Sequence, residues 1–173
     1  DGTRIQNESV TLTGENVAGV DVPDRSRGTG PVTSYARIIA NESTADSLDT
    51  YGLSVDHPQA SELITETEFE SQYLVVFVHN EALSSEPTSV ETVTRSGGRT
   101  TVSLSNPFVK ANIPGRDAPE FVAMSEDAGL VETVLVRVPT QGESVPDSVR
   151  VQFGTLEMNA TSGGNRVPCG WGS

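Results

Sequence analysis

The sequence has few lysines, aromatic residues, cysteines and histidines. Lys110 is the only lysine, so ten of the eleven basic residues are arginines, against 24 acidic residues. The formal net charge of −13 argues against nucleic acids and anionic membranes as partners, because both are densely negative. An acidic excess with so little lysine is typical of halophilic proteins, whose repulsion is screened by salt. An ordinary acidic secreted protein is the alternative.

Cysteine and tryptophan each occur once, and both lie near the C-terminus. Cys169 cannot close an intrachain disulfide, so it is either a free thiol or half of an intermolecular bridge. It also lies far from the N-terminus, where the anchor cysteine of a lipoprotein would be found. Trp171 is expected to be buried in a contact, because a lone exposed tryptophan is unusual.

Long apolar runs are missing too. No stretch approaches the roughly 20 apolar residues that span a bilayer, and no signal-peptide pattern is present. Residue 1 is Asp, which favours a mature chain numbered after processing over an arbitrary boundary. Asn7, Asn41 and Asn159 begin N-glycosylation sequons, although chance alone often gives one or two. We expect an extracellular or cell-surface glycoprotein.

Patterns that carry catalysis or bind cofactors are also missing. His57 precedes Pro58 and His79 ends an apolar run, and neither has a second ligand at metal-site spacing. We interpret both histidines as surface or strand-end residues. There is no nucleophile elbow, phosphate-binding loop or dinucleotide fingerprint. The sequence therefore predicts no catalytic residue, metal site or cofactor, with a serine hydrolase as a minor alternative.

Acidic residues cluster at Glu66, Glu68 and Glu70, which alternate along the chain. If this stretch is extended, all three side chains project from one face. They lack the alternating Asp/Asn pattern with glycine of a calcium-binding loop. We interpret them as a solvated acidic face, with a weak cation site as the alternative.

The most apolar stretch is the centre of residues 69–80. Tyr73 to Val78 are six consecutive apolar residues, three of them β-branched and two aromatic. A short run of this kind, bounded by polar residues, predicts a strand that is covered on both faces. We expect it to be the central strand.

Alternating patterns predict further strands around it. The clearest hairpin pairs 88–94 with 99–104 around Gly97 and Gly98. One short helix is expected within 41–53, with Ser43 or Thr44 as its N-cap, and one more helical turn is compatible with 59–64. The loops are mostly too short for helical crossovers. The sequence therefore predicts an all-β fold, a mainly antiparallel β-sandwich or barrel of about seven or eight strands. The other predicted strands are 9–13, 17–22, 34–40, 132–138 and 148–153.

Three segments follow from these patterns: an N-terminal arm (1–30), a β-domain (31–154) and a C-terminal tail (155–173). Val10 and Leu12 lie on one face of a short strand, the pattern of a strand that is added to another sheet. We expect these two residues, with Cys169 and Trp171, to contact a neighbouring copy and give a head-to-tail polymer. The alternative is that both ends fold back on their own domain.

One stretch resembles a known family. Glu68, Phe69 and Glu70, followed by 74–77, resemble the step into the buried strand of the C-terminal domain of PrcB-type accessory proteins. Related domains occur in exported proteins of halophilic archaea. The resemblance runs from about Tyr35 to Phe153, with Ser84 to Pro87 where the family usually has glycines. It is carried by Leu48, Phe69, 74–77, Val90, Val102, 134–138 and 149–151.

The resemblance implies a stabilising or adhesive domain without catalytic residues. Together with the composition, it leaves two expectations for function. The first is an exported structural protein of the cell surface, which assembles into a filament or layer through its ends by strand complementation. The second is a non-enzymatic accessory or binding domain that contacts other surface proteins.

Overall fold

A computed structural model of the chain describes residues 2–13, 15–18, 33–50, 52–80, 88–105, 131–154 and 156–168. The described part is all-β, as predicted, but it has ten strands and three short helices instead of seven or eight strands and one helix. The elements are β1 (Thr3–Arg4), β2 (Glu8–Thr13), β3 (Thr33–Ile39), α1 (Glu42–Ala45), α2 (Leu53–Asp56), α3 (Pro58–Thr65), β4 (Gln72–His79), β5 (Val90–Ser96), β6 (Arg99–Leu104), β7 (Glu132–Pro139), β8 (Ser148–Phe153), β9 (Leu156–Thr161) and β10 (Asn165–Pro168).

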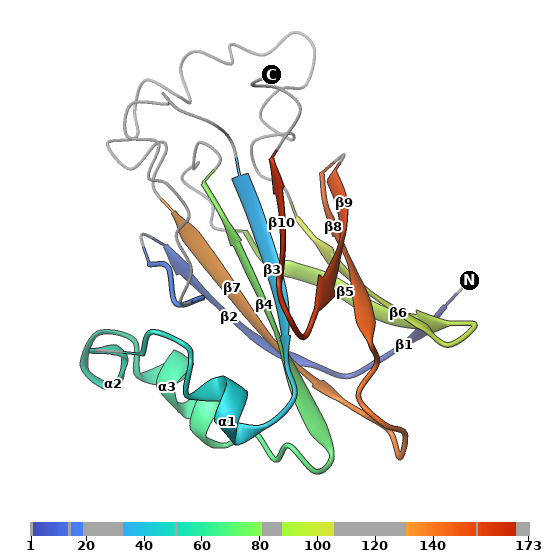
Figure 1. Cartoon of the computed structure of the whole chain (residues 1–173), viewed down its shortest axis with the longest axis horizontal. Helices are drawn as coiled ribbons and strands as arrows, with labels where there is room; N and C mark the ends of the chain where they lie inside the picture. The colour runs from blue at the N-terminus through green and yellow to red at the C-terminus, as the bar shows by residue number, and fades with distance from the viewer. Residues whose placement is uncertain are drawn as a thin grey trace, which may run out of the picture.

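All ten strands belong to one curled sheet. The strand order is β1-β5-β6-β8-β9-β3-β4-β7-β2, with β10 paired to β3. The sheet is mixed, because β6 runs parallel to β8 and β3 runs parallel to β9, while the other described pairs are antiparallel. In Figure 1 the curl sets β2, β7, β4, β3 and β10 against β5, β6, β8 and β9, which gives a sandwich-like fold.

The predicted strand that is covered on both faces is confirmed as β4, although it is third from the β2 end of the strand order and not at its centre. It pairs with β3 on one side and β7 on the other, and every residue from Tyr73 to His79 is buried. Alternate side chains enter two different cores. Phe77 packs inside the curled sheet, whereas Val76 packs under the helices. Burial on both faces explains why this strand is continuously apolar.

The helices cover the outer face of β4 and β2. Leu53 of α2 and Leu63 of α3 join Leu12 and Val76 in the second core. The predicted helix in 41–53 is correct in place but shorter: Asn41 is the N-cap, not Ser43 or Thr44, and its Oδ1 accepts from Thr44 N at 2.8 Å. The longest helix is α3, where the sequence indicated only one further turn.

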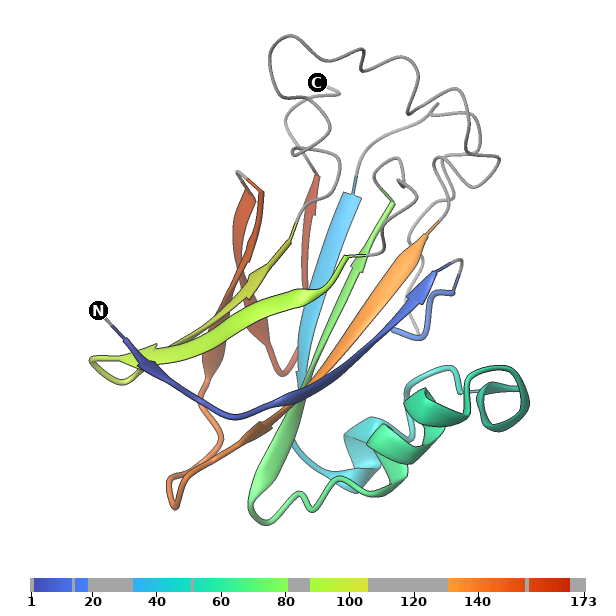
Figure 2. The ribbon, with the colours of Figure 1, turned by 180° about the vertical axis from the view of Figure 1, so that it is seen from behind.

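The N-terminal segment closes the curled sheet. Residues 3–4 pair with β5 and residues 8–13 pair with β7, at opposite ends of the strand order. Figure 2 shows this segment crossing from one layer to the other. The buried hydroxyl of Thr133 donates to Glu15 O at 2.6 Å, which fixes the chain just beyond β2. The N-terminal residues were expected in an arm outside the β-domain, but residues 3–4 and 8–13 are strands of its sheet.

The C-terminal segment also belongs to the sheet as far as Pro168. β9 pairs with β8 and β10 pairs with β3, although residues 155–173 were expected to be a polar tail. Met158 and Ala160 of β9 are buried in the core inside the curl. The separate arm and tail that the sequence predicted are thus continuous with the domain wherever the structure describes them.

The hairpin around Gly97 and Gly98 is confirmed: β5 and β6 pair, and both glycines have positive φ angles, of 58° and 81°. Such angles favour glycine, since a Cβ atom is strained there. The sequence also predicted a strand at 17–22. Residues 17 and 18 lie outside any strand, and residues 19–22 lie beyond the described residues. None of the helices that the structure describes is long and apolar enough to cross a membrane.

Candidate functional site

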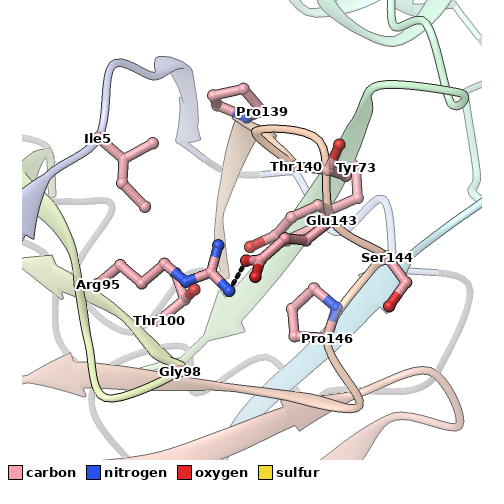
Figure 3. A pocket seen from close by; sticks show the side chains of 10 residues that line it. All are labelled: Ile5, Tyr73, Arg95, Gly98, Thr100, Pro139, Thr140, Glu143, Ser144 and Pro146. Carbon is pink, nitrogen blue, oxygen red and sulfur yellow. Dashed lines mark ion pairs between the residues drawn. The ribbon is translucent and has the colours of Figure 1, made fainter.

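A pocket opens where the N-terminal segment, β4, the β5–β6 hairpin and the turn after β7 meet. Its volume is about 220 Å³. Ile5, Pro139 and Pro146 form apolar parts of its wall, and hydroxyl and charged groups form the rest. Figure 3 shows the side chains of Tyr73, Arg95 and Glu143 meeting there. The curl creates this pocket, because it brings together four stretches that are distant in the sequence.

The charged groups of the pocket form an ion pair. Arg95 of β5 bonds Glu143, which lies in the turn between β7 and β8. The Arg95 side chain is 30% exposed and that of Glu143 is 56% exposed, so water competes with their attraction. An ion pair this exposed contributes about 0–1 kcal/mol to stability. It therefore holds the turn weakly and can be opened at little cost.

Tyr73 brings a buried hydroxyl to the same place. Its side chain is only 2% exposed. Burial raises the pKa of the Tyr73 phenol, although a hydrogen bond with Thr100 and the positive charge of Arg95 act in the opposite direction. The phenol therefore stays protonated at neutral pH. Beside Arg95, it is a second group that can donate a hydrogen bond into the pocket.

A second cluster of chemically capable residues is buried where β4 ends and β7 begins. Nε2 of His79 lies 2.7 Å from Oε1 of Glu132, and the Thr88 backbone N–H donates to Oε2 at 3.2 Å. His79 and Glu132 are 2% and 1% exposed. The imidazole also packs against Phe77 and Phe153, with ring centroids 5.7 and 4.6 Å away.

The charge state of Glu132 reflects these contacts. Burial alone would raise the pKa of the Glu132 carboxyl, but the hydrogen bond and charge of His79, together with the two bonds from Thr88, outweigh it. The net effect is a lowered pKa, so Glu132 is ionised at neutral pH. A buried carboxylate is tolerated because its partners compensate for the lost water.

The geometry of this cluster differs from that of a catalytic triad. In a triad, the acid and the nucleophile lie on opposite nitrogens of the imidazole. Here the Thr88 hydroxyl, 3.4 Å away, and Glu132 both face Nε2 of His79. This arrangement ties three segments together rather than activating the hydroxyl. Within the described ranges, no three His, Cys, Asp or Glu side chains lie close enough together to hold a metal ion.

The three sequon asparagines lie in different settings. Asn41 and Asn159 are exposed, the first as the cap of α1 and the second on β9 opposite Arg150. Asn7 is half-buried, and its Nδ2 donates to Ile5 O at 3.1 Å. One of the two hydrogens on the nitrogen that would carry a glycan is therefore bonded to the backbone at Asn7.

The four expected assembly residues divide into two groups. Val10 and Leu12 lie on β2 in the chain's own sheet, where Leu12 is 1% exposed within the core under the helices. This matches the alternative in which the N-terminal segment folds back. Cys169 and Trp171 lie outside the described residues.

Several site residues were missed or misinterpreted. Glu66, Glu68 and Glu70 are exposed, but they lie at the end of α3 and in the turn before β4, not on a strand. His79 does end a strand, but it is buried instead of lying at the surface. The sequence indicated its partner only weakly, because Glu132 begins the apolar run at 132–138. In adjacent antiparallel strands, the end of one strand lies beside the start of the other. Nothing in the sequence pointed to Tyr73 and Arg95 as neighbours.

The chain matches no family model, and no curated protein and no solved structure is significantly similar to it. The resemblance to the PrcB-type domain therefore stays a prediction.

Proposed function

We propose that the protein is an exported, non-enzymatic accessory domain that binds another protein at the cell surface. The observation that carries this proposal is the use of both described terminal segments as strands of one sheet. Segments that are strands of their own sheet are not free arms that could be inserted into a neighbour's sheet. A closed β-domain of this kind suits a binding module, which presents a rigid surface to a partner.

The polar groups support a non-enzymatic function. His79 and Glu132, the most chemically capable buried pair that the structure describes, bond each other and Thr88 in the interior. Buried networks with satisfied partners stabilise and specify a core. The surface location is supported by the acidic composition and by two exposed sequons, Asn41 and Asn159.

Self-assembly is the second candidate, and one observation favours it. β2 is the last strand of the described sheet order, so its outer edge can pair with a strand of another copy. Glu8 and Ser9 on this strand are exposed. Assembly would then use edge pairing instead of the exchange of a free arm, with Cys169 and Trp171 as further contacts.

The molar mass in solution separates the two candidates. We would measure the full chain by light scattering in molar salt over a wide range of concentrations. An accessory domain is expected to stay monomeric throughout. A mass that grows with concentration would overturn this proposal in favour of assembly. Ser9→Pro then tests the edge, because proline cannot donate to a strand pair. Ser148→Pro, at the exposed start of β8 and away from that edge, is its control.

A further inference from the structure

We propose that the pocket beside Tyr73 binds a small carboxylate with a short apolar body, and that Arg95 holds it in place of Glu143. The site is independent of the accessory function and would stand if that function were disproved. The groups on which it depends lie on Ile5, β4, the β5–β6 hairpin and the turn after β7.

The pocket already accepts one carboxylate. Glu143 reaches Arg95 from the turn, so the guanidinium is oriented toward a carboxylate that lies within the pocket. A guanidinium binds a carboxylate through two parallel hydrogen bonds. A ligand that offers the same group can replace Glu143 without any new geometry.

Two hydroxyls make the position of Arg95 favourable for a carboxylate. Tyr73 and Thr100 are 2% and 5% exposed, so burial restricts the movement of both side chains. Both line the pocket with Arg95. A ligand oxygen between the guanidinium and the phenol gains a charged and a neutral donor from groups that are already ordered.

Glu143 is the group that gives way. Its backbone N–H bonds Thr140 O at 3.2 Å, and Thr140 N bonds Ser71 O at 2.8 Å, so the turn itself is anchored. The carboxylate is more than half exposed and regains water when it leaves Arg95. Exchange therefore moves one side chain and leaves the backbone in place.

The apolar wall and the volume define the rest of the ligand. Ile5 is 5% exposed, and Pro139 and Pro146 flank the opening. A volume of about 220 Å³ lies below the roughly 300–1,000 Å³ of pockets for drug-sized molecules. It suits a carboxylate that carries a few carbon atoms, either as a free acid or as the end of a peptide.

Backbone amide spectra during titration with propionate test the proposal, with propionamide as the neutral control and ionic strength held constant. We expect shifts around Tyr73, Arg95 and Thr100 with propionate only. Glu143→Gln should tighten binding about two- to fivefold, because a competitor that contributes up to about 1 kcal/mol is removed. Arg95→Gln should abolish the shifts, and Tyr73→Phe should weaken binding while the ring still fills its place.

The spectra also report whether each variant is folded, through residues such as Val102 that lie away from the pocket. Equal shifts with propionate and propionamide, or no gain in Glu143→Gln, would overturn the proposal. N-acetylalanine and its amide then identify the source of the carboxylate. Tighter binding of N-acetylalanine than of propionate indicates a peptide end, and the reverse indicates a free acid.

Discussion

Nε2 of His79 lies 2.7 Å from Oε1 of Glu132, across the last register pair that joins β4 to β7. Both side chains are buried, and the Thr88 backbone N–H binds the second carboxylate oxygen. The pair therefore joins two central strands to the segment that leads into β5. It is a stabilising contact whose strength depends on pH.

The pH dependence has a defined sign. The pKa of Glu132 is lower in the folded chain than in the unfolded chain, so folding favours the ionised form. Its contribution is complete above the ordinary pKa of a glutamate and is lost as the pH falls through the lowered folded value. Glu132→Gln should cost about 3 kcal/mol at neutral pH and should flatten the acid limb, as measured by denaturant unfolding at several pH values.

Glu8→Gln is the matched control. Glu8 pairs with Arg137 of the same strand β7, but its side chain is 67% exposed, so the loss should stay below about 1 kcal/mol. Equal losses for Glu132→Gln and Glu8→Gln would contradict a stabilising function of the buried pair.

Phe77 tests the core inside the curled sheet. It is 1% exposed, and its ring lies 5.2 Å from that of Phe153, centroid to centroid. Phe77→Ala should lower the free energy of unfolding by about 3–5 kcal/mol, because it leaves a cavity. Phe69→Ala should lower the free energy of unfolding by less, because Phe69 is only partly buried against the other core. Near wild-type stability of Phe77→Ala would exclude β4 as a strand that is covered on both faces.

The central strands could be predicted from the sequence, because their signal is local. Tyr73 to Val78 are apolar on both faces, and Gly97 and Gly98 mark the hairpin turn on their own. These features depend on side-chain pattern and turn chemistry, which neighbouring residues determine.

The ends of the sheet and the pocket could not be predicted in this way. In β9, only Met158 and Ala160 are buried, so its alternation is weak and the strand depends on β8 for its place. The parallel pair of β6 and β8 joins residues about 50 positions apart, with no turn between them to signal it. Tyr73, Arg95 and Glu143 meet only because the sheet curls.

Gly164 tests whether the C-terminal strands belong to the domain. It has a φ angle of 83°, and a Cβ atom there would lie 2.1 Å from the hydroxyl oxygen of Tyr35. Gly164→Ala should therefore lower the free energy of unfolding by about 1–3 kcal/mol, and the melting temperature should fall with it. Gly163 is the control, since no atom lies within 4 Å of its added Cβ and its φ angle is not positive. If both alanine variants melt like the wild type, β9 and β10 do not pack on β3.

The helical segment is the place where salt should matter most. Residues 42–70 carry no lysine or arginine, and every carboxylate that they hold is exposed. Repulsion among them is screened by salt, so the melting temperature should rise from dilute buffer to molar salt. A melting temperature that does not change over this range would contradict the halophilic interpretation. The exposed carboxylates are Glu42, Asp46, Asp49, Asp56, Glu62, Glu66, Glu68 and Glu70.

A variant with fewer charges tests whether the helical segment is the source of the salt dependence. Changing Glu66, Glu68 and Glu70 together to Gln should reduce the rise in melting temperature with salt, because it removes three neighbouring charges. If the triple variant keeps the full salt dependence, the repulsion lies elsewhere on the surface.

Whether residues 2–13 complete their own domain is tested most directly by hydrogen exchange of the β2 amides in a dilute, monomeric sample. Every second amide of β2, on the side that pairs with β7, should exchange slowly, as amides of a stable sheet do. A free arm would instead exchange at the rate of an unfolded peptide throughout residues 8–13. Slow exchange in the monomer is the result that we predict. Fast hydrogen exchange that slows only when copies associate would contradict a domain completed by its own N-terminal strands. It would favour the hypothesis that this segment completes the sheet of a neighbouring copy.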